Sequence, residues 1–312
     1  MVVKARLIEG PVGGRFPFSN CLLIEESGIR VLVDAGCGRE NLEHLRDRID
    51  AVLFTHHHPD HISGYWIVGG GKPVFSPLGE EPYRSLEDLG KRFAGHKYRD
   101  WIEMARALMD LRLVPAGEYY EPGEDFCFRG LCVKTIPAPG HLLTHTLLDL
   151  GGGWIHLTDI DLTGFGPWYA NPESSPQGFL DDILMVPSLD PVQATTSHKP
   201  DLFTGQELMT RLARYAMRIP DVMEAIHGAL LELGQSDARG LAGRGIVYRR
   251  YIGGVEEAMR YFETMMISKL LPWMADMGCV ARSGTVYKPA GDCDTSRLRS
   301  RILDALGVEN VA

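Results

Sequence analysis

Short apolar and β-branched runs alternate with clusters of glycine, proline and polar residues over the first two hundred positions of the chain. Runs of this length between such clusters predict β-strands. Helical stretches lie between them, at Asn41–Arg48 and at Ser85–Leu113, the second with a break near Gly95. The predicted strands are Val2–Ile8, Cys21–Glu25, Arg30–Asp34, Ala51–Thr55, Pro73–Ser76, Leu131–Ile136, Thr146–Asp149, Trp154–Thr158 and Val192–Thr196.

The pattern becomes helical after about residue 205. A first helix is predicted at Leu208–Ile219, where Pro220 would stop it, and a second runs from Asp221 to Gly234. A third, Val255–Leu271, carries apolar residues at three- and four-residue spacing, which is typical of one face of an amphipathic helix. This apolar stripe consists of Ala258, Met259, Phe262, Met265, Met266 and Leu270.

A glycine turn within residues 277–291 predicts a short β-hairpin after these helices. Helices followed by such a wing resemble winged-helix modules. We therefore expect a core of residues 1–204 and a mainly helical C-terminal extension of residues 205–312. An uncovered apolar stripe would be a large exposed patch, so we also expect the extension to contribute to a homodimer.

The length and composition favour a folded protein outside the membrane. The chain has 312 residues, 45% of them hydrophobic, which is ample for a packed core. The first residues lack the apolar segment of a signal peptide, and no window approaches the roughly 20 apolar residues that span a bilayer. The six cysteines form no CxxC pair. We expect a cytoplasmic protein with reduced thiols.

The acidic charge lies in the first two thirds of the chain. Residues 201–312 carry 14 Lys and Arg against 14 Asp and Glu, so the whole net charge of −9 belongs to residues 1–200. A surface that binds phosphates would carry the opposite charge. An acidic domain is instead suited to holding divalent cations, so the charge argues weakly against a nucleic-acid partner. We expect a small-molecule substrate.

The stretch FTHHHPDHISG at Phe54–Gly64 places four of the eleven histidines and one aspartate in six consecutive positions. Buried imidazoles need polar partners, so this density points to metal binding. His56 and His58 are two residues apart in an extended segment and project to one side, while His57 projects to the other. After the turn at Pro59, Asp60 and His61 can face a neighbouring point.

Further metal-binding side chains follow later predicted strands. His141 and His145 come after the strand that ends near Pro137, and Asp159 ends the strand Trp154–Thr158. His198 follows the strand Val192–Thr196. Side chains at the ends of strands can come together at one edge of a sheet, where binding and catalytic residues are often found on loops.

Five motifs occur in the order seen in metallo-β-lactamase-fold hydrolases: VLVDAG, THHHPDH, PGHLLTHT, TDIDL and TTSH. Residues 1–200 resemble that superfamily of thioesterases, lactonases, phosphodiesterases and nucleases. The resemblance implies a four-layer αββα sandwich. It also implies that His56, His58 and His141 bind one metal, that Asp60, His61 and His198 bind a second, and that Asp159 bridges the two.

Two positions depart from the usual motifs. Thr158 precedes the bridging aspartate where glycine or alanine is common, and Asp161 is a second candidate for the bridge, although Asp159 directly ends the strand. The segment LLTH follows His141 and lacks the usual glycine. We expect His145 to orient a ligand or touch the substrate.

The ligand set predicts a hydrolase. Histidine and carboxylate without thiolate suit two Zn²⁺ ions, with Fe or Mn as alternatives. A hydroxide shared by the metals would attack a small ester, thioester or lactone, with Asp60 and His145 as the candidate catalytic residues. A phosphodiesterase or nuclease at the same metals, and a mononuclear-iron sulfur dioxygenase, are the alternatives.

Overall fold

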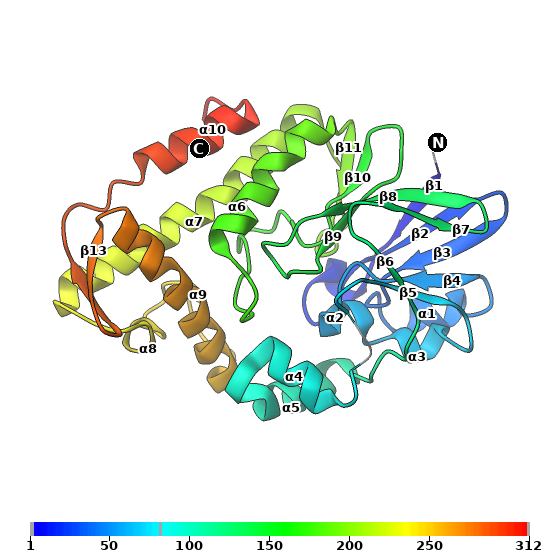
Figure 1. Cartoon of the computed structure of the whole chain (residues 1–312), viewed down its shortest axis with the longest axis horizontal. Coiled ribbons are helices and arrows are strands. Elements are labelled where there is room, and N and C mark those ends of the chain that lie inside the picture. The colour runs from blue at the N-terminus through cyan, green and yellow to red at the C-terminus, as the bar shows by residue number, and fades with distance from the viewer. Residues whose placement is uncertain (1–2, 81–82, 311–312) are drawn as a thin grey trace.

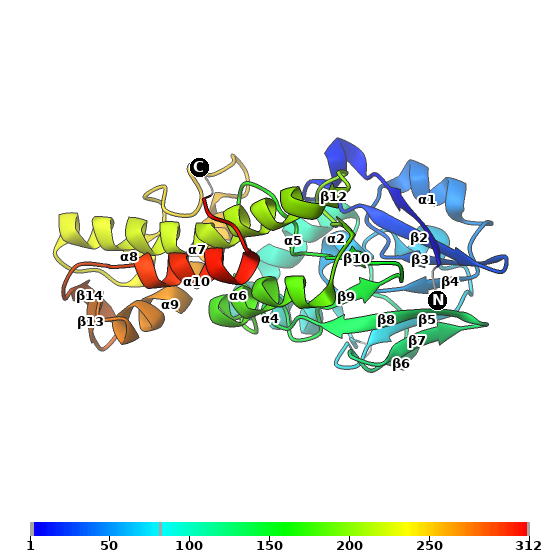
Figure 2. The same ribbon diagram turned by 90° about the horizontal axis from the view of Figure 1, so that it is seen from above.

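The computed structural model describes residues 3–80 and 83–310. Two sheets lie face to face with helices on their outer sides, and a helical extension lies at one end of this sandwich (Figures 1 and 2). The predicted αββα sandwich with a mainly helical extension is therefore confirmed. The division into residues 1–204 and 205–312 stays a prediction.

The first sheet is built from the N-terminal part of the chain, in the strand order β1-β2-β3-β4-β5-β6. Its first three strands are antiparallel, and β3 to β6 are parallel. The strands are β1 (Lys4–Ile8), β2 (Cys21–Glu26), β3 (Ile29–Val33), β4 (Ala51–Leu53), β5 (Val74–Pro77) and β6 (Glu118–Tyr120).

The second sheet has the order β12-β11-β10-β9-β8-β7 and is antiparallel except for the β10–β11 pair. All nine predicted strands are present in the two sheets, whereas β6, β7 and β12 were not predicted. The strands of this sheet are β7 (Asp125–Phe128), β8 (Leu131–Pro137), β9 (Thr146–Asp149), β10 (Trp154–His156), β11 (Gln193–Thr195) and β12 (Phe203–Thr204).

A core of alternating strand residues joins the two sheets. Leu22, Val31 and Leu53 from the first sheet are fully buried together with Leu131 and Leu148 from the second. The period-two alternation of these residues directs one side of each strand inward. The helices outside the sandwich are α1 (Arg39–Leu45), α2 (Pro59–Ile62), α3 (Tyr65–Val68) and α6 (Pro176–Met185).

The predicted break at Gly95 divides the helical insertion into α4 (Leu86–Ala94) and α5 (Tyr98–Met109), with a short 3-10 turn between them. The pair lies beside α9 (Glu256–Asp276) of the extension, where the rings of His96 and Tyr261 are 5.4 Å apart (Figure 1). The ring of Phe93 in α4 lies 4.9 Å from the ring of His58. The insertion therefore reaches the predicted metal site.

The extension contains α7 (Gly205–Leu233), α8 (Ala238–Leu241), α9 (Glu256–Asp276) and α10 (Ser296–Leu306), and the predicted hairpin is present as β13 (Val280–Ser283) and β14 (Val286–Pro289). The prediction that Pro220 stops the helix is wrong, because α7 continues through it. Ala216, Ile219 and Pro220 are all buried. The packing of these buried residues offsets the hydrogen bond that proline removes, a loss of about 3 kcal/mol inside a helix.

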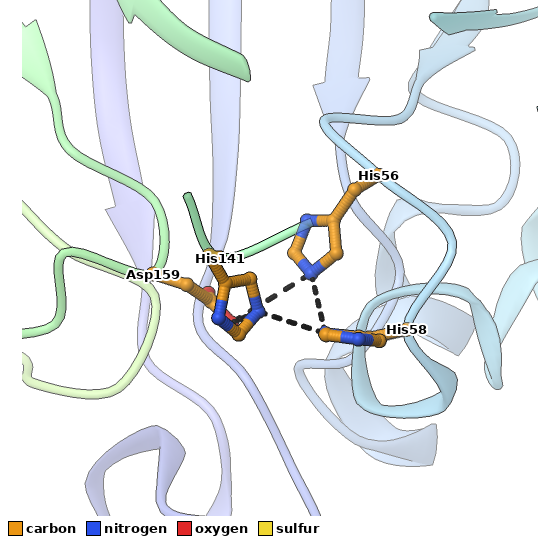
Figure 3. A group of neighbouring side chains, drawn as sticks. All are labelled: His56, His58, His141 and Asp159. Atoms are coloured by element: carbon orange, nitrogen blue, oxygen red, sulfur yellow. Dashed lines mark hydrogen bonds and ion pairs between the residues drawn. The ribbon is translucent and has the colours of Figure 1, made fainter. Parts of the chain in front are cut away.

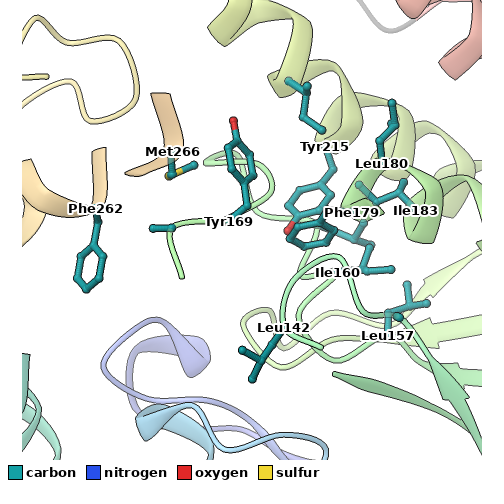
Figure 4. Close-up of a cluster of buried hydrophobic side chains, with 14 of the residues drawn as sticks. Leu142, Leu157, Ile160, Tyr169, Phe179, Leu180, Ile183, Tyr215, Phe262 and Met266 are labelled. Carbon is teal, nitrogen blue, oxygen red and sulfur yellow. The ribbon is translucent and has the colours of Figure 1, made fainter. Parts of the chain in front are cut away.

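The apolar stripe of α9 packs against its own chain. Phe262, Met266 and Leu270 are buried, and Figure 4 shows Met266 beside Tyr169, which belongs to the loop after β10. The exposed patch that motivated a homodimer is therefore covered from within. The homodimer stays a prediction, but the stripe no longer supplies a reason for it.

One expectation about the cysteines is wrong. Cys127 and Cys132 form a disulfide, because the register of the β7–β8 hairpin places them directly opposite each other with their Cα atoms 4.2 Å apart. The four remaining cysteines, all within the described residues, are free. In the part of the chain that the structure describes, no helix is both long and apolar enough to cross a bilayer.

Candidate metal centre

The histidine-rich motif lies between β4 and α2. His58 has an extended backbone (φ −62°, ψ 146°), and Pro59 begins α2, which carries Asp60 and His61. Gly36 allows this close packing, because a Cβ there would lie 1.7 Å from the carbonyl oxygen of Asp60. The glycine of the VLVDAG motif therefore lets the ligand turn approach β3.

The first ligand cluster consists of His56, His58, His141 and Asp159 (Figure 3). His58 Nδ1 lies 3.0 Å from His56 Nε2 and 2.9 Å from His141 Nε2. Asp159 Oδ2 lies 3.1 Å from His141 Nε2 and 3.6 Å from His56 Nε2. Ligands about 2.0–2.1 Å from a tetrahedral ion would be ~3.3 Å apart, so these spacings fit one zinc-sized ion.

The second ligand cluster consists of Asp60, His61 and His198. His198 Nε2 lies 3.5 Å from Asp60 Oδ2. Asp159 Oδ1 faces this cluster, 3.0 Å from His61 Nε2 and 3.6 Å from His198 Nε2. The structure thus brings together all seven side chains that the sequence marked as ligands.

Asp159 is placed to bridge the two clusters, since each of its carboxylate oxygens faces one of them. Asp161 belongs to neither cluster, and its Oδ1 accepts a hydrogen bond of 2.8 Å from the Thr163 N–H. Thr158 has a left-handed backbone (φ 50°), which is uncommon for a β-branched residue. Its hydroxyl donates to the Thr146 carbonyl at 2.9 Å, and this bond helps to hold the turn that presents Asp159.

Hydrogen bonds to Nδ1 orient three of the imidazole rings in the two clusters. Asp34 Oδ2 accepts from His61 Nδ1 at 2.8 Å, as expected for a carboxylate that supports a ligand. The Trp168 carbonyl accepts from His141 Nδ1 at 2.9 Å, and the Gly14 carbonyl accepts from His198 Nδ1 at 2.7 Å. These bonds leave Nε2 of each ring free for a metal.

Electrostatics divide the histidines into two groups. Burial lowers the pKa of His56 and His58 well below the ordinary value, so both rings are neutral and can offer a lone pair. Burial also disfavours the charged form of His198, but Asp159 and Asp60 outweigh it and raise its pKa to about 9. The second cluster therefore attracts positive charge, and a bound cation would take the place of that proton.

Buried atoms without partners show that the clusters fit a metal. His61 Nε2 and Asp159 Oδ1 are both buried and lack a hydrogen-bond partner among the described residues, although they lie 3.0 Å apart. Leaving such polar atoms unpaired is costly. Cations held at the two clusters would satisfy both atoms.

His145 lies beside the clusters but outside them. Its Nδ1 donates to the Ala138 carbonyl at 2.9 Å, and its Nε2 accepts from the Asp159 N–H at 3.1 Å. Burial lowers the pKa of His145 to about 3, so the ring is neutral. It orients the bridging aspartate, which is one of the two roles expected for it, and its catalytic role stays a prediction.

His57 points away from the clusters, as expected. Its Nε2 lies 2.8 Å from Ser76 Oγ, and its backbone N–H donates to Glu80 Oε1 at 3.3 Å. His57 belongs to a buried polar network with Glu80 and takes no part in ligand geometry.

We expect His57→Ala to lower the free energy of unfolding by about 1–3 kcal/mol, because it leaves buried polar groups without a partner. Metal content should be unchanged, because His57 contacts neither cluster. Chemical denaturation and elemental analysis of the purified variant test the two effects separately. Loss of a metal ion from a folded variant would contradict the assignment.

The loop Ile160–Ala170, which follows Asp159, contains the aromatic residues Phe165, Trp168 and Tyr169. Tyr169 is 1% exposed and belongs to the core. Trp168 is half-buried, with its ring 5.8 Å from that of His58 and 6.1 Å from that of His141. Tyr169 of this loop therefore packs in the core, whereas Trp168 lies beside the first ligand cluster.

Sequence reasoning missed several residues around the ligands. Asn171 lies with its Nδ2 2.7 Å from His58 Nε2, and Ser174 Oγ donates to the His141 carbonyl at 2.7 Å. Ser19 Oγ donates to the Asp60 carbonyl at 2.9 Å. No spacing links these residues to the histidine motifs, so only the folded chain identifies them.

Comparison with known proteins agrees with this geometry. Residues 14–153 match the family model of the metallo-beta-lactamase superfamily. The matched region, which contains five of the seven side chains of the two clusters, belongs to the metallo-β-lactamase superfamily. The family match and the paired ligand clusters indicate a metal-dependent hydrolase that uses divalent metal ions.

One curated relative and two solved structures extend the comparison. Over 205 residues the chain is 26% identical to a hydroxyacylglutathione hydrolase of Acidiphilium cryptum (strain JF-5), covering 64% of this chain and 69% of the relative. A metallo-beta-lactamase family protein of Thermus thermophilus has 21% identity and a TM-score of 0.68, covering 91% of this chain and 98% of its own. A beta-lactamase domain protein of Burkholderia ambifaria has 22% identity and a TM-score of 0.66, covering 92% and 91%. The two structures share the fold, extension included.

Proposed function

We propose that the protein hydrolyses a small ester, thioester or lactone at a dinuclear metal centre. The observation that carries the proposal is the position of Asp159, whose two carboxylate oxygens each face one ligand cluster. The Acidiphilium relative is named for the hydrolysis of hydroxyacylglutathione, a thioester, and this supports thioesters as the first class to test. Zinc is the proposed metal, because the ligands are imidazoles and carboxylates.

Two divalent cations, when bound, would lower the pKa of a bound water molecule towards neutrality and would polarise the substrate carbonyl. The chain's own residues supply orientation and proton transfer. Asp60 is 8% exposed and belongs to the second cluster, where its carboxylate can orient the attacking water and accept its proton. Although burial opposes ionisation of Asp159, His61 and His198 hold its pKa well below the usual range, so it stays ionised.

Two aromatic rings form an apolar wall beside the first cluster. Phe93 and Trp168 lie against the ring of His58, with centroids 4.9 Å and 5.8 Å away. Apolar walls strengthen the electrostatic interactions inside a site. A substrate carbonyl bound next to these rings would therefore be polarised more strongly than in water.

We expect purified protein to contain two zinc ions per chain and to hydrolyse a hydroxyacylglutathione thioester faster than matched phosphodiesters. Elemental analysis without added metal and a panel of one thioester, one alkyl ester, one lactone and one phosphodiester test this. Chelation should abolish the activity and zinc should restore it. A single iron ion would favour a sulfur dioxygenase, and preference for the phosphodiester would favour a nuclease; either result would contradict the proposal.

A further inference from the structure

The loop of residues 171–174 contacts two ligands of the first cluster. Asn171 is 1% exposed and faces His58 Nε2, while Ser174 Oγ donates to the carbonyl of His141. Ser175 N–H donates to the Gly140 carbonyl at 2.9 Å, next to His141. A displacement of this loop would therefore move both rings.

Three backbone carbonyls of the loop accept hydrogen bonds from one ammonium group. Lys269 Nζ donates to the carbonyls of Asn171, Pro172 and Ser174, the last two at 3.4 Å and 2.6 Å. An ammonium has three donors and the loop offers three acceptors, so the match is complete. Burial lowers the pKa of Lys269 to about 8, and the group is still mostly charged at pH 7.

Lys269 belongs to the same face of α9 as the apolar stripe. Phe262, Met266 and Lys269 are spaced at four and then three residues, which places them on one side of a helix. The ring of Phe262 lies 5.3 Å from that of Trp168, whose carbonyl accepts from His141. One helix face thus supports His141 through Trp168 and through Ser174.

A second cation holds the loop from the other side. Arg92 of α4 binds Glu173 with Nε to Oε1 at 2.7 Å and Nη2 to Oε2 at 3.1 Å. The second cluster is supported by other residues, since Asp34 holds His61 and the Gly14 carbonyl holds His198. The contacts of the 171–174 loop therefore favour the first cluster selectively.

We propose that Lys269 is a positioning residue for the first ligand cluster: it fixes the 171–174 loop, and the loop fixes His58 and His141. Lys269 then links the C-terminal extension to the backbone of the loop that supports the first cluster. The inference rests on the metal centre of the proposed function and is independent of the substrate. Groups that orient metal ligands typically change metal affinity by about 10–100-fold.

The test measures zinc affinity of the full-length chain by competition with a chromophoric chelator. Lys269→Met is placed in a His198→Ala background, which keeps the first cluster, and in a His141→Ala background, which keeps the second. We expect zinc affinity to fall about 10–100-fold in the first background and less than about threefold in the second. Lys269→Arg, which keeps the donors, should restore most of the loss.

Lys288→Met is the matched control, because Lys288 is the other lysine of the extension and is exposed. It should change neither affinity. Asn171→Ala acts on His58 directly and should reproduce the selective loss if Lys269→Met does not fold, as judged by circular dichroism of the metal-free protein. Equal weakening in both backgrounds, or no change in either, would overturn the inference. Failure of the unmodified chain to bind two ions would instead overturn the proposed function.

Discussion

Asp159→Ala is expected to remove at least one of the two metal ions and to lower kcat on the order of 10³-fold or more. Asp159 faces both clusters, so its loss removes an oxygen ligand from each. The expected loss exceeds the roughly 10²–10³-fold typical of removing one stabilising group, because metal binding fails as well. Elemental analysis and steady-state kinetics with excess zinc measure the two effects.

Asp161→Asn is the control for this bridge assignment. The amide oxygen can still accept the hydrogen bond from Thr163 N–H, and Asp161 belongs to neither cluster. We expect two metal ions and nearly unchanged kinetics. If Asp161→Asn lost metal while Asp159→Ala retained two ions, the bridge would be Asp161.

Asp60→Asn is expected to lower kcat by ~10² or more and to change KM only slightly. Asparagine has the shape of aspartate, but its amide cannot accept the proton that the mechanism assigns to the carboxylate. The change should therefore act on the transition state more than on substrate binding.

The variant must be assayed with zinc content measured in the same sample, because Asp60 is also a member of the second cluster. A fully loaded variant with the activity of the unmodified chain would exclude Asp60 as the proton acceptor. A variant that loses one ion, and recovers its activity when zinc is added in excess, would show that Asp60 acts only as a ligand.

The sequence by itself predicted nine of the twelve strands of the two sheets and the candidate ligands. The strand predictions succeeded because period-two alternation and turn residues are local signals, readable over about four to eight positions. The seven candidate ligands were recognised because four of them form a dense local motif and the other three follow predicted strands. The resemblance to metallo-β-lactamase-fold hydrolases then separated these seven from the remaining histidines. The end of a strand can be recognised from the neighbouring residues alone.

Only the tertiary structure decided how that site is supported. Lys269 and Asn171 are 98 residues apart in sequence and meet only after α9 packs on the sandwich. Packing against distant parts of the chain also explains why α7 continues through Pro220 and why the stripe of α9 is buried. In each case the free energy of packing against a distant segment outweighs the local preference that the sequence displays, so no local pattern could predict it.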